Sequence, residues 1–174
     1  EELFKDTELA LHQAKRFGGD RVEPFRPAFR DGGSNIVQIE ADLHRAIERD
    51  QISLVYQPII AAKTGDIAGF EALMRWRHPT RGLVPPIEFI PAAEASGLIV
   101  DLTAYAFEEV GRVFPELLLA AQTNPGALDG PLFMTVNVSG RDLAGASFPE
   151  MIADFLARTR IAPSSLKIEV TESC

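Results

Sequence analysis

Two apolar stretches near the middle of the chain decide its fold: ISLVYQPII at residues 52–60 and IAGFEALMRW at residues 67–76. Both are rich in β-branched and aromatic residues, which favours strands. Between them lies the turn sequence Lys63-Thr-Gly-Asp66. Because so short a connection cannot cross over a sheet, the two strands are predicted to form an antiparallel pair.

Downstream of this pair, helical and strand patterns alternate. Three helices and two strands are predicted, at residues 88–96, 101–122 and 149–159 and at residues 132–138 and 166–171. The second helix is expected to bend or break at Pro115, and residues 122–131 are interpreted as a loop insertion. This alternation favours parallel β/α units, either in an open sheet or in a barrel.

Upstream of the pair, the pattern predicts two helices separated by a linker. The first covers residues 7–17 and ends at Gly18-Gly19. Residues 20–34 contain prolines and glycines and are predicted to connect two domains. A second helix is expected to start with Asn35 as its cap.

Composition limits the classes of partner. Of the 174 residues, 46% are hydrophobic and 24% are charged, and the net charge is −8. An acidic surface repels nucleic-acid backbones, so long DNA or RNA is not expected, whereas a small anion could bind a local arginine or metal. The single cysteine cannot form an internal disulfide, which fits a reducing cytoplasm. A cytoplasmic location for this part is also compatible with a parent chain that is attached to a membrane further upstream.

The strand at residues 67–76 carries charge on one face. Alternation places Phe70, Ala72, Met74 and Trp76 on a packing face. Glu71 and Arg75 lie on the other face, about 13 Å apart at 3.3 Å per residue, so each needs its own partner unless both lie at a solvated edge.

Two later strands also carry polar side chains near their ends, namely Asn137 and Glu169. In parallel α/β barrels the C-terminal strand ends hold the active site. Oxygen donors of this kind suit Mg²⁺, Mn²⁺ or Ca²⁺ rather than zinc. The alternative for Asn137 is a turn cap at a strand end.

The surroundings of Glu71-Ala-Leu73 resemble the EAL domain family, which is named after this motif. Further family motifs occur in family order over about residues 36–174: Tyr56-Gln-Pro58, His78-Pro79, the run Pro86–Glu94, Asn137-Val-Ser139 and Ile168–Ser173. The resemblance implies a TIM-like (β/α)8 barrel whose first strand is antiparallel, with only about the first half present here.

The family hydrolyses cyclic di-GMP, a bacterial second messenger, to linear pGpG. The resemblance implies Mg²⁺ or Mn²⁺ as cofactor and assigns roles to individual residues. Glu71, Asn137 and Glu169 would be metal ligands, Glu71 and Glu169 would be catalytic, Gln57, Leu73 and Arg75 would bind substrate, and Glu172 would hold a nearby loop. It also implies a homodimer formed through the EAL domain.

Residues 7–21 carry a second resemblance, to the last helix and strand of a GGDEF (diguanylate cyclase) domain. It rests on Ala10-Leu-His-Gln-Ala-Lys15 with Gly18 and Arg21. The division that follows is a GGDEF-like tail at 1–22, a linker at 23–34 and the N-terminal part of an EAL domain at 35–174. The parent would then hold a GGDEF domain upstream in the same chain.

The sequence is compatible with three functions. The intact protein would be a cyclic-di-GMP phosphodiesterase, and this piece alone is predicted to be inactive because the family's Asp-Asp pair and later Lys, Glu and Gln cannot be placed in it. The alternative is a non-catalytic module that binds cyclic di-GMP and passes on a signal. A scaffold without a ligand fits less well, since Glu71, Arg75, Asn137 and Glu169 are all retained.

Overall fold

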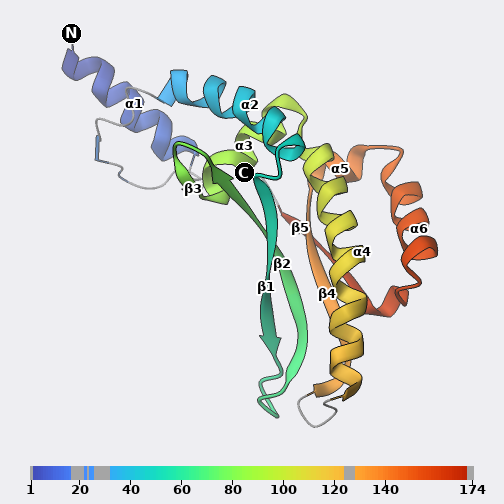
Figure 1. The fold of residues 1–174 in the computed structure, drawn as a ribbon. Helices are drawn as coiled ribbons and strands as arrows, with labels where there is room; N and C mark the ends of the chain where they lie inside the picture. Colours follow the sequence, from blue (N-terminus) through green and yellow to red (C-terminus); the bar gives the residue numbers. More distant parts are fainter. Residues whose placement is uncertain (1, 17–21, 23, 26–31, 124–127, 172–174) are drawn as a thin grey trace.

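The computed structural model describes residues 2–16, 22, 24–25, 32–123 and 128–171. Pairs of helices alternate with one strand or a group of strands along this length (Figure 1). The elements are α1 (Glu2–Arg16), α2 (Gly32–Glu48), β1 (Ile52–Ile60), β2 (Ile67–His78), β3 (Gly82–Val84), α3 (Pro86–Ser96), α4 (Ile99–Thr123), β4 (Leu128–Ser139), α5 (Gly140–Ala144), α6 (Phe148–Thr159), a 3₁₀ turn at Pro163–Ser165 and β5 (Leu166–Thr171).

The strands form one mixed sheet in the order β1-β2-β4-β5, with β3 paired to β2. β1 and β2 are antiparallel, as predicted, and β2, β4 and β5 are mutually parallel. The turn between β1 and β2 is closed by a hydrogen bond of 2.8 Å from Ala61 N to Asp66 O. Gly65 takes the left-handed conformation there, with φ of 81°, which glycine adopts without strain.

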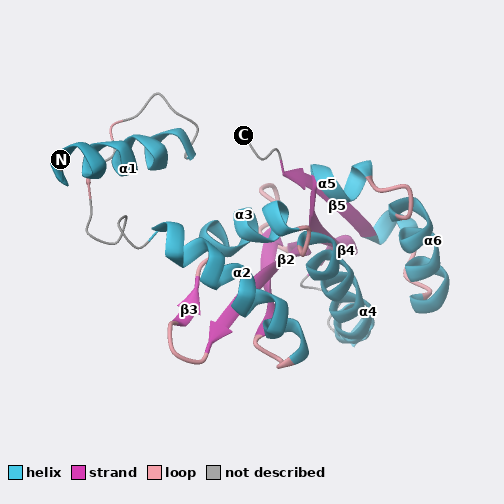
Figure 2. Ribbon diagram, turned by 90° about the horizontal axis from the view of Figure 1, so that it is seen from above, coloured by secondary structure: helices cyan, strands magenta, loops and turns pink. Residues whose placement is uncertain are grey.

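One face of the sheet packs against helices and forms the main core. Ala72, Val136 and Val138 contribute from the strands, while Phe107 of α4 and Phe155 of α6 contribute from the helices. The two phenylalanine rings meet edge to face, with their centroids 5.2 Å apart. Figure 2 shows α4 and α6 side by side along this face. The packing face predicted for β2 is therefore confirmed.

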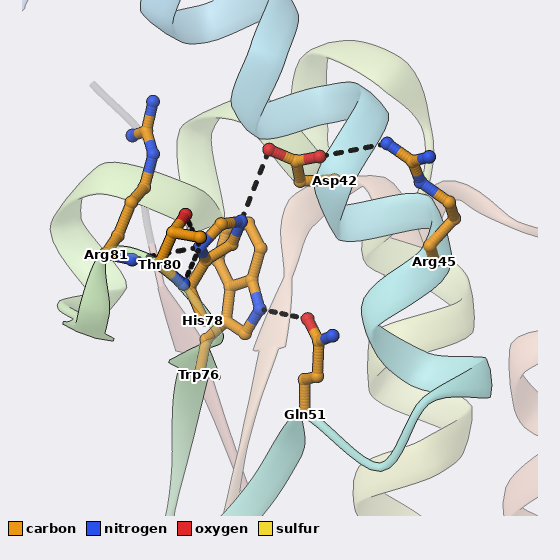
Figure 3. Close-up of polar contacts among 7 residues, drawn as sticks. All are labelled: Asp42, Arg45, Gln51, Trp76, His78, Thr80 and Arg81. Atoms are coloured by element: carbon orange, nitrogen blue, oxygen red, sulfur yellow. Dashed lines mark hydrogen bonds and ion pairs between the residues drawn. The ribbon is translucent and has the colours of Figure 1, made fainter.

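A second cluster of buried side chains joins α2 and α3 to the end of β2. Its centre is the fully buried Trp76, packed among Ile39, Leu43 and Phe89. The indole lies edge to face with the Phe89 ring at a centroid distance of 5.8 Å. Its Nε1 donates to Gln51 Oε1 at 3.4 Å (Figure 3). The indole N–H is thereby satisfied in an otherwise apolar site.

His78 fastens the same end of β2 to α2 (Figure 3). Its Nδ1 accepts hydrogen bonds from the backbone N–H groups of Thr80 at 3.2 Å and Arg81 at 3.1 Å. Nδ1 therefore carries no proton, and Nε2–H donates to Asp42 Oδ2 at 3.3 Å. Both ring nitrogens are thus used in holding the turn after β2 and the helix beside it.

Several element boundaries differ from the sequence predictions. α2 begins at Gly32, so Asn35 lies inside the helix rather than capping it. α4 runs unbroken through Pro115, because Phe107, Val110 and Phe114 bury one side of the helix and outweigh a single lost backbone hydrogen bond.

The segment before the second parallel strand is also corrected. β4 already begins at Leu128, within the stretch interpreted as a loop insertion, and Leu128 pairs with Ile67 of β2. The strand was underestimated because Asp129, Gly130 and Pro131 are poor strand formers, although Leu128 before them is already paired. The short elements β3 and α5 were not predicted at all.

Tyr56 yields a test of this core. Its hydroxyl is buried and has no hydrogen-bond partner among the described residues. Burial, reinforced by the negative charge of Glu109, raises the pKa of Tyr56 to about 12. The unfolded chain ionises near about pH 10, so the stability that the neutral form contributes is complete below that pH and is lost as pH rises towards 12.

We expect Tyr56→Phe to leave the free energy of unfolding at pH 7 unchanged or to raise it by up to about 1 kcal/mol, because an unsatisfied buried hydroxyl is removed. The loss of stability between about pH 10 and 12 should also become shallower. Urea unfolding followed by circular dichroism measures both effects. Tyr105→Phe is the control, since its hydroxyl donates to Ile52 O at 2.8 Å and its removal should cost about 1 kcal/mol. A clearly destabilised Tyr56→Phe variant would contradict the prediction.

Candidate functional site

The candidate site starts from a contact between β2 and β4. Asn137 Nδ2 donates a hydrogen bond of 2.9 Å to Glu71 Oε1. A carboxylate can only accept, so the amide nitrogen must be the atom turned towards Glu71. The amide oxygen of Asn137 is then the atom left for another partner. The contact brings together two of the residues predicted to bind metal.

Glu169 lies on the next strand in the same row. In the parallel ladder between β4 and β5, Asn137 and Glu169 are direct partners. Neighbouring strands are about 4.8 Å apart, so side chains on one face of three adjacent strands can converge on a common point. Glu169 is exposed, whereas Glu71 and Asn137 are half-buried. The sheet therefore presents two carboxylates on either side of one amide.

This donor set fits a hard divalent cation. Mg²⁺ favours oxygen ligands and is commonly held by one or two carboxylates while it keeps several waters. Because Asn137 donates to Glu71 through Nδ2, its amide oxygen Oδ1 is available to a cation, which matches a ligand role. Across the described residues, no group of three His, Cys, Asp or Glu side chains could hold a metal by itself. The two carboxylates and the amide would therefore supply only part of a coordination sphere.

The predicted substrate-binding residues surround this set on the sheet. Gln57 of β1 is the direct partner of Glu71 in the antiparallel ladder. Leu73 and Arg75 follow Glu71 along the same face of β2. The Arg75 guanidinium folds back, and its Nη1 donates to Met74 O at 2.8 Å. Glu71 and Arg75 thus have separate partners, as the sequence predicted, and Glu172 lies outside the described residues.

A cavity of about 270 Å³ opens where the two central strands separate. The pairing of β2 with β4 extends to Ala72 opposite Val136. Beyond this point the cavity is lined by Leu73 and Arg75 from β2 and by Asn137 from β4. Helices α3 and α4 close it from behind with mainly apolar side chains. Leu73, Arg75 and Asn137 therefore lie at the rim of a hollow between the strand ends. Gln57, Glu71 and Glu169 do not line it.

Sequence reasoning missed one polar cluster beside this hollow. Asp142 of α5 is only 4% exposed. Its Oδ2 accepts from Ser139 N at 3.0 Å, from Ser139 Oγ at 2.6 Å and from Thr103 Oγ1 at 3.0 Å. Ser139 and Asp142 form a capping box at the start of α5. The Ser-x-x-Asp spacing carried that signal, although Thr103 could not have been linked to it from sequence.

The row of residues next to Asn137 on this face of the sheet contains Thr135 and Lys167. Thr135 of β4 lies between Glu71 and Lys167 in the two ladders, and its buried hydroxyl has no partner among the described residues. Lys167 Nζ lies 3.1 Å from the centroid of the Phe133 ring. A cation over an aromatic face is a favourable contact. Aromatic packing therefore supports the site from below.

Comparison with known proteins identifies the family. The EAL domain model matches residues 40–174. The chain belongs to the EAL domain family. The cyclic di-GMP phosphodiesterase NbdA of Pseudomonas aeruginosa is 36% identical over 99% of this chain and 21% of its own length. The bifunctional diguanylate cyclase/cyclic di-GMP phosphodiesterase MucR of the same organism is 34% identical over 99% of this chain and 24% of its own length.

Solved EAL structures share the fold. The MucR phosphodiesterase in complex with cyclic di-GMP superimposes with a TM-score of 0.67 at 36% identity, covering 78% of this chain and 52% of that one. The prediction of a TIM-barrel-like EAL fold, present in part, is confirmed. This EAL chain spans about a fifth to a quarter of the length of the two curated relatives. None of the helices in the described ranges has the length and apolar character needed to span a bilayer.

Gly69 allows a test of the packing below the site. A Cβ built on Gly69 would lie 2.5 Å from Phe133 O and 2.8 Å from the Phe133 ring. Because the nearest atom belongs to the backbone of the paired strand, Gly69→Ala must push β2 and β4 apart. We expect a loss of about 1–3 kcal/mol in the free energy of unfolding, measured by urea denaturation. Gly140→Ala is the control, since its Cβ would meet no atom within 4 Å. Equal stability of the two variants would refute the close approach.

Proposed function

We propose that this chain is the first part of an EAL domain that hydrolyses cyclic di-GMP to linear pGpG in the intact protein. The observation that carries the proposal is the hydrogen bond between Asn137 and Glu71, which orients two predicted metal ligands towards each other. Relatives at 36% and 31% identity are named cyclic di-GMP phosphodiesterases, which supports the same chemistry here.

The cation required would be Mg²⁺ or Mn²⁺, held by Glu71, Asn137 and Glu169 together with groups supplied elsewhere in the intact protein. A bound divalent cation lowers the pKa of a coordinated water and stabilises the leaving oxygen of a phosphodiester. Glu71 is oriented for this role by Asn137 Nδ2, so its carboxylate needs little rearrangement. Glu169, the ladder partner of Asn137, would be the third metal ligand that this chain supplies.

The remaining site residues would bind the dinucleotide. Arg75 has N–H groups besides the one used on Met74 O, and a planar guanidinium can hold two non-bridging phosphate oxygens. Leu73 would contact the nucleotide at the rim of the cavity, and Gln57 would lie at the floor of the site beside Glu71. Glu172 would hold a loop near the metal.

The proposal extends to the arrangement of the intact protein. The match to MucR covers 99% of this chain and so includes residues upstream of the EAL match at 40–174. This supports a GGDEF-like tail at 1–22 and a linker at 23–34, followed by the EAL part at 35–174. A homodimer through the EAL domain and a cytoplasmic location complete the proposal. Residues 1–174 alone should show no turnover.

The metal role can be tested by substitution in the intact protein. Incubation with cyclic di-GMP and Mg²⁺, followed by chromatography, should show linear pGpG. We expect Glu71→Ala and Asn137→Ala each to lower the rate by about 100-fold or more, because loss of a ligand exceeds the loss of an outer-shell partner. Glu150→Ala on the exposed surface of α6 should retain full activity.

An unchanged rate in Glu71→Ala would refute the metal role. Binding of cyclic di-GMP by the unaltered protein without any turnover would instead favour the receptor alternative, in which the domain holds the dinucleotide and passes on a signal.

The substrate role of Arg75 has its own test. Arg75→Lys keeps the charge but removes the planar fork, so one hydrogen bond to the phosphate is lost. A charged hydrogen bond is worth about 1.5–3 kcal/mol, so we expect KM for cyclic di-GMP to rise by about tenfold or more. Arg77→Lys is the matched control, because Arg77 is exposed further along the same strand. Steady-state kinetics at saturating Mg²⁺ give the comparison, and equal KM values for the two variants would contradict the assignment.

A further inference from the structure

We infer that Asp142, together with Thr103, is a positioning residue that holds the end of β4 so that Asn137 faces the metal site. The inference deepens the proposed function and rests on it. Its basis is the way in which β4 is supported along its length, which changes at the row that carries Asn137.

From Met134 to Val136, β4 is paired on both sides. Val136 has Ala72 of β2 as its partner on one side and Ile168 of β5 on the other. From Asn137 onwards the ladder continues only with β5, up to Ser139 opposite Thr171. On the β2 side, the end of β4 borders the 270 Å³ cavity instead. A strand end supported on one side alone is free to pivot towards such a hollow.

Asp142 supplies support at this position. Its Oδ2 accepts from both the backbone N–H and the hydroxyl of Ser139, two residues after Asn137. The same oxygen accepts from Thr103 Oγ1 on α4, a helix that also lines the cavity. One carboxylate oxygen therefore connects the end of β4, the start of α5 and the N-terminal part of α4. All three residues are at most 4% exposed.

The cost of burying the Asp142 carboxylate indicates that this residue does more than cap α5. α5 has only five residues, and the hydroxyl of Ser139 already accepts from Asp142 N at 3.2 Å. Burying a carboxylate is costly unless several donors satisfy it, and hydrogen bonds to a charge are about twice as strong as neutral ones. The donor from Thr103 satisfies none of the backbone groups of α5. Its effect is to fix the distance between α4 and the strand end.

The consequence for the site concerns metal affinity rather than overall folding. Asn137 can keep Nδ2 on Glu71 and Oδ1 available only while its backbone stays in place. If the tether is loosened, the strand end gains conformations in which the amide turns away from Glu71, and binding of the cation must select against them. The affinity for Mg²⁺ then falls while the rate at saturating Mg²⁺ is retained.

The test uses the intact protein and three substitutions near the tether. Thr103→Val removes the hydroxyl and keeps the shape, Thr103→Ser keeps the hydroxyl, and Asp142→Asn removes the charge. We expect Thr103→Val and Asp142→Asn to raise the Mg²⁺ concentration for half-maximal hydrolysis of cyclic di-GMP by about tenfold, with kcat at saturating Mg²⁺ within about twofold of the unaltered protein. Thr103→Ser should behave like the unaltered protein.

Thr159→Val is the matched control for stability. Its hydroxyl donates to Phe155 O at 2.8 Å within α6, away from the site strands. It should lower the melting temperature about as much as Thr103→Val does and leave the Mg²⁺ dependence unchanged. If Thr103→Val and Asp142→Asn also lower only the melting temperature, Asp142 is a structural residue and the inference is overturned.

Calorimetric titration with Mg²⁺ in the absence of nucleotide separates this inference from the proposed function. Binding that weakens by about tenfold in Thr103→Val supports the tether even if the unaltered protein hydrolyses nothing, in which case the proposed function fails alone. Equal Mg²⁺ binding in both proteins overturns the tether alone. An unaltered protein that binds no Mg²⁺ overturns both.

Discussion

The parallel ladder between β2 and β4 is the constraint on which the site depends. It sets Glu71 opposite Thr135, and so brings the next side chain on that face of β4, Asn137, within 2.9 Å of the carboxylate. Side chains alternate along a strand, so a slip of one residue would turn Asn137 into the core and Val136 out of it. The burial of Ala72 and Val136 against the helices therefore fixes the register that the polar face requires.

The two strands that carry Glu71 and Asn137, β2 and β4, are held at their C-terminal ends in the same way. β2 ends at His78, whose ring joins the turn after the strand to Asp42 of α2. β4 ends at Ser139, which Asp142 joins to α4. In each case a carboxylate on a helix accepts from a residue at the strand end. Apolar packing alone is tolerant of small shifts, whereas a buried carboxylate must keep its donors, so these links define where the strand ends lie.

The sequence predicted those features of the structure that depend on residues close together in the chain. The strands at 52–60 and 166–171 followed from local sequence and matched the observed bounds. The two faces of β2 followed from the alternation of its side chains. The passage of α4 through Pro115 and the early start of β4 at Leu128 are set by partners distant in sequence, which no local pattern reports. The Asn137–Glu71 contact was expected only through resemblance to a family, because spacing cannot show which strands are neighbours.

The choice of an amide at the centre of the site follows from charge. Glu71 and Glu169 already place two carboxylates on adjacent sides of Asn137, and Asp142 adds a buried third beside the end of the same strand. An aspartate at position 137 would set two anions in direct contact, which is unfavourable in the absence of a cation. The asparagine instead donates to one carboxylate and leaves its Oδ1 for the cation proposed above. A neutral side chain at position 137 therefore lets carboxylates lie on both neighbouring strands without a third charge between them.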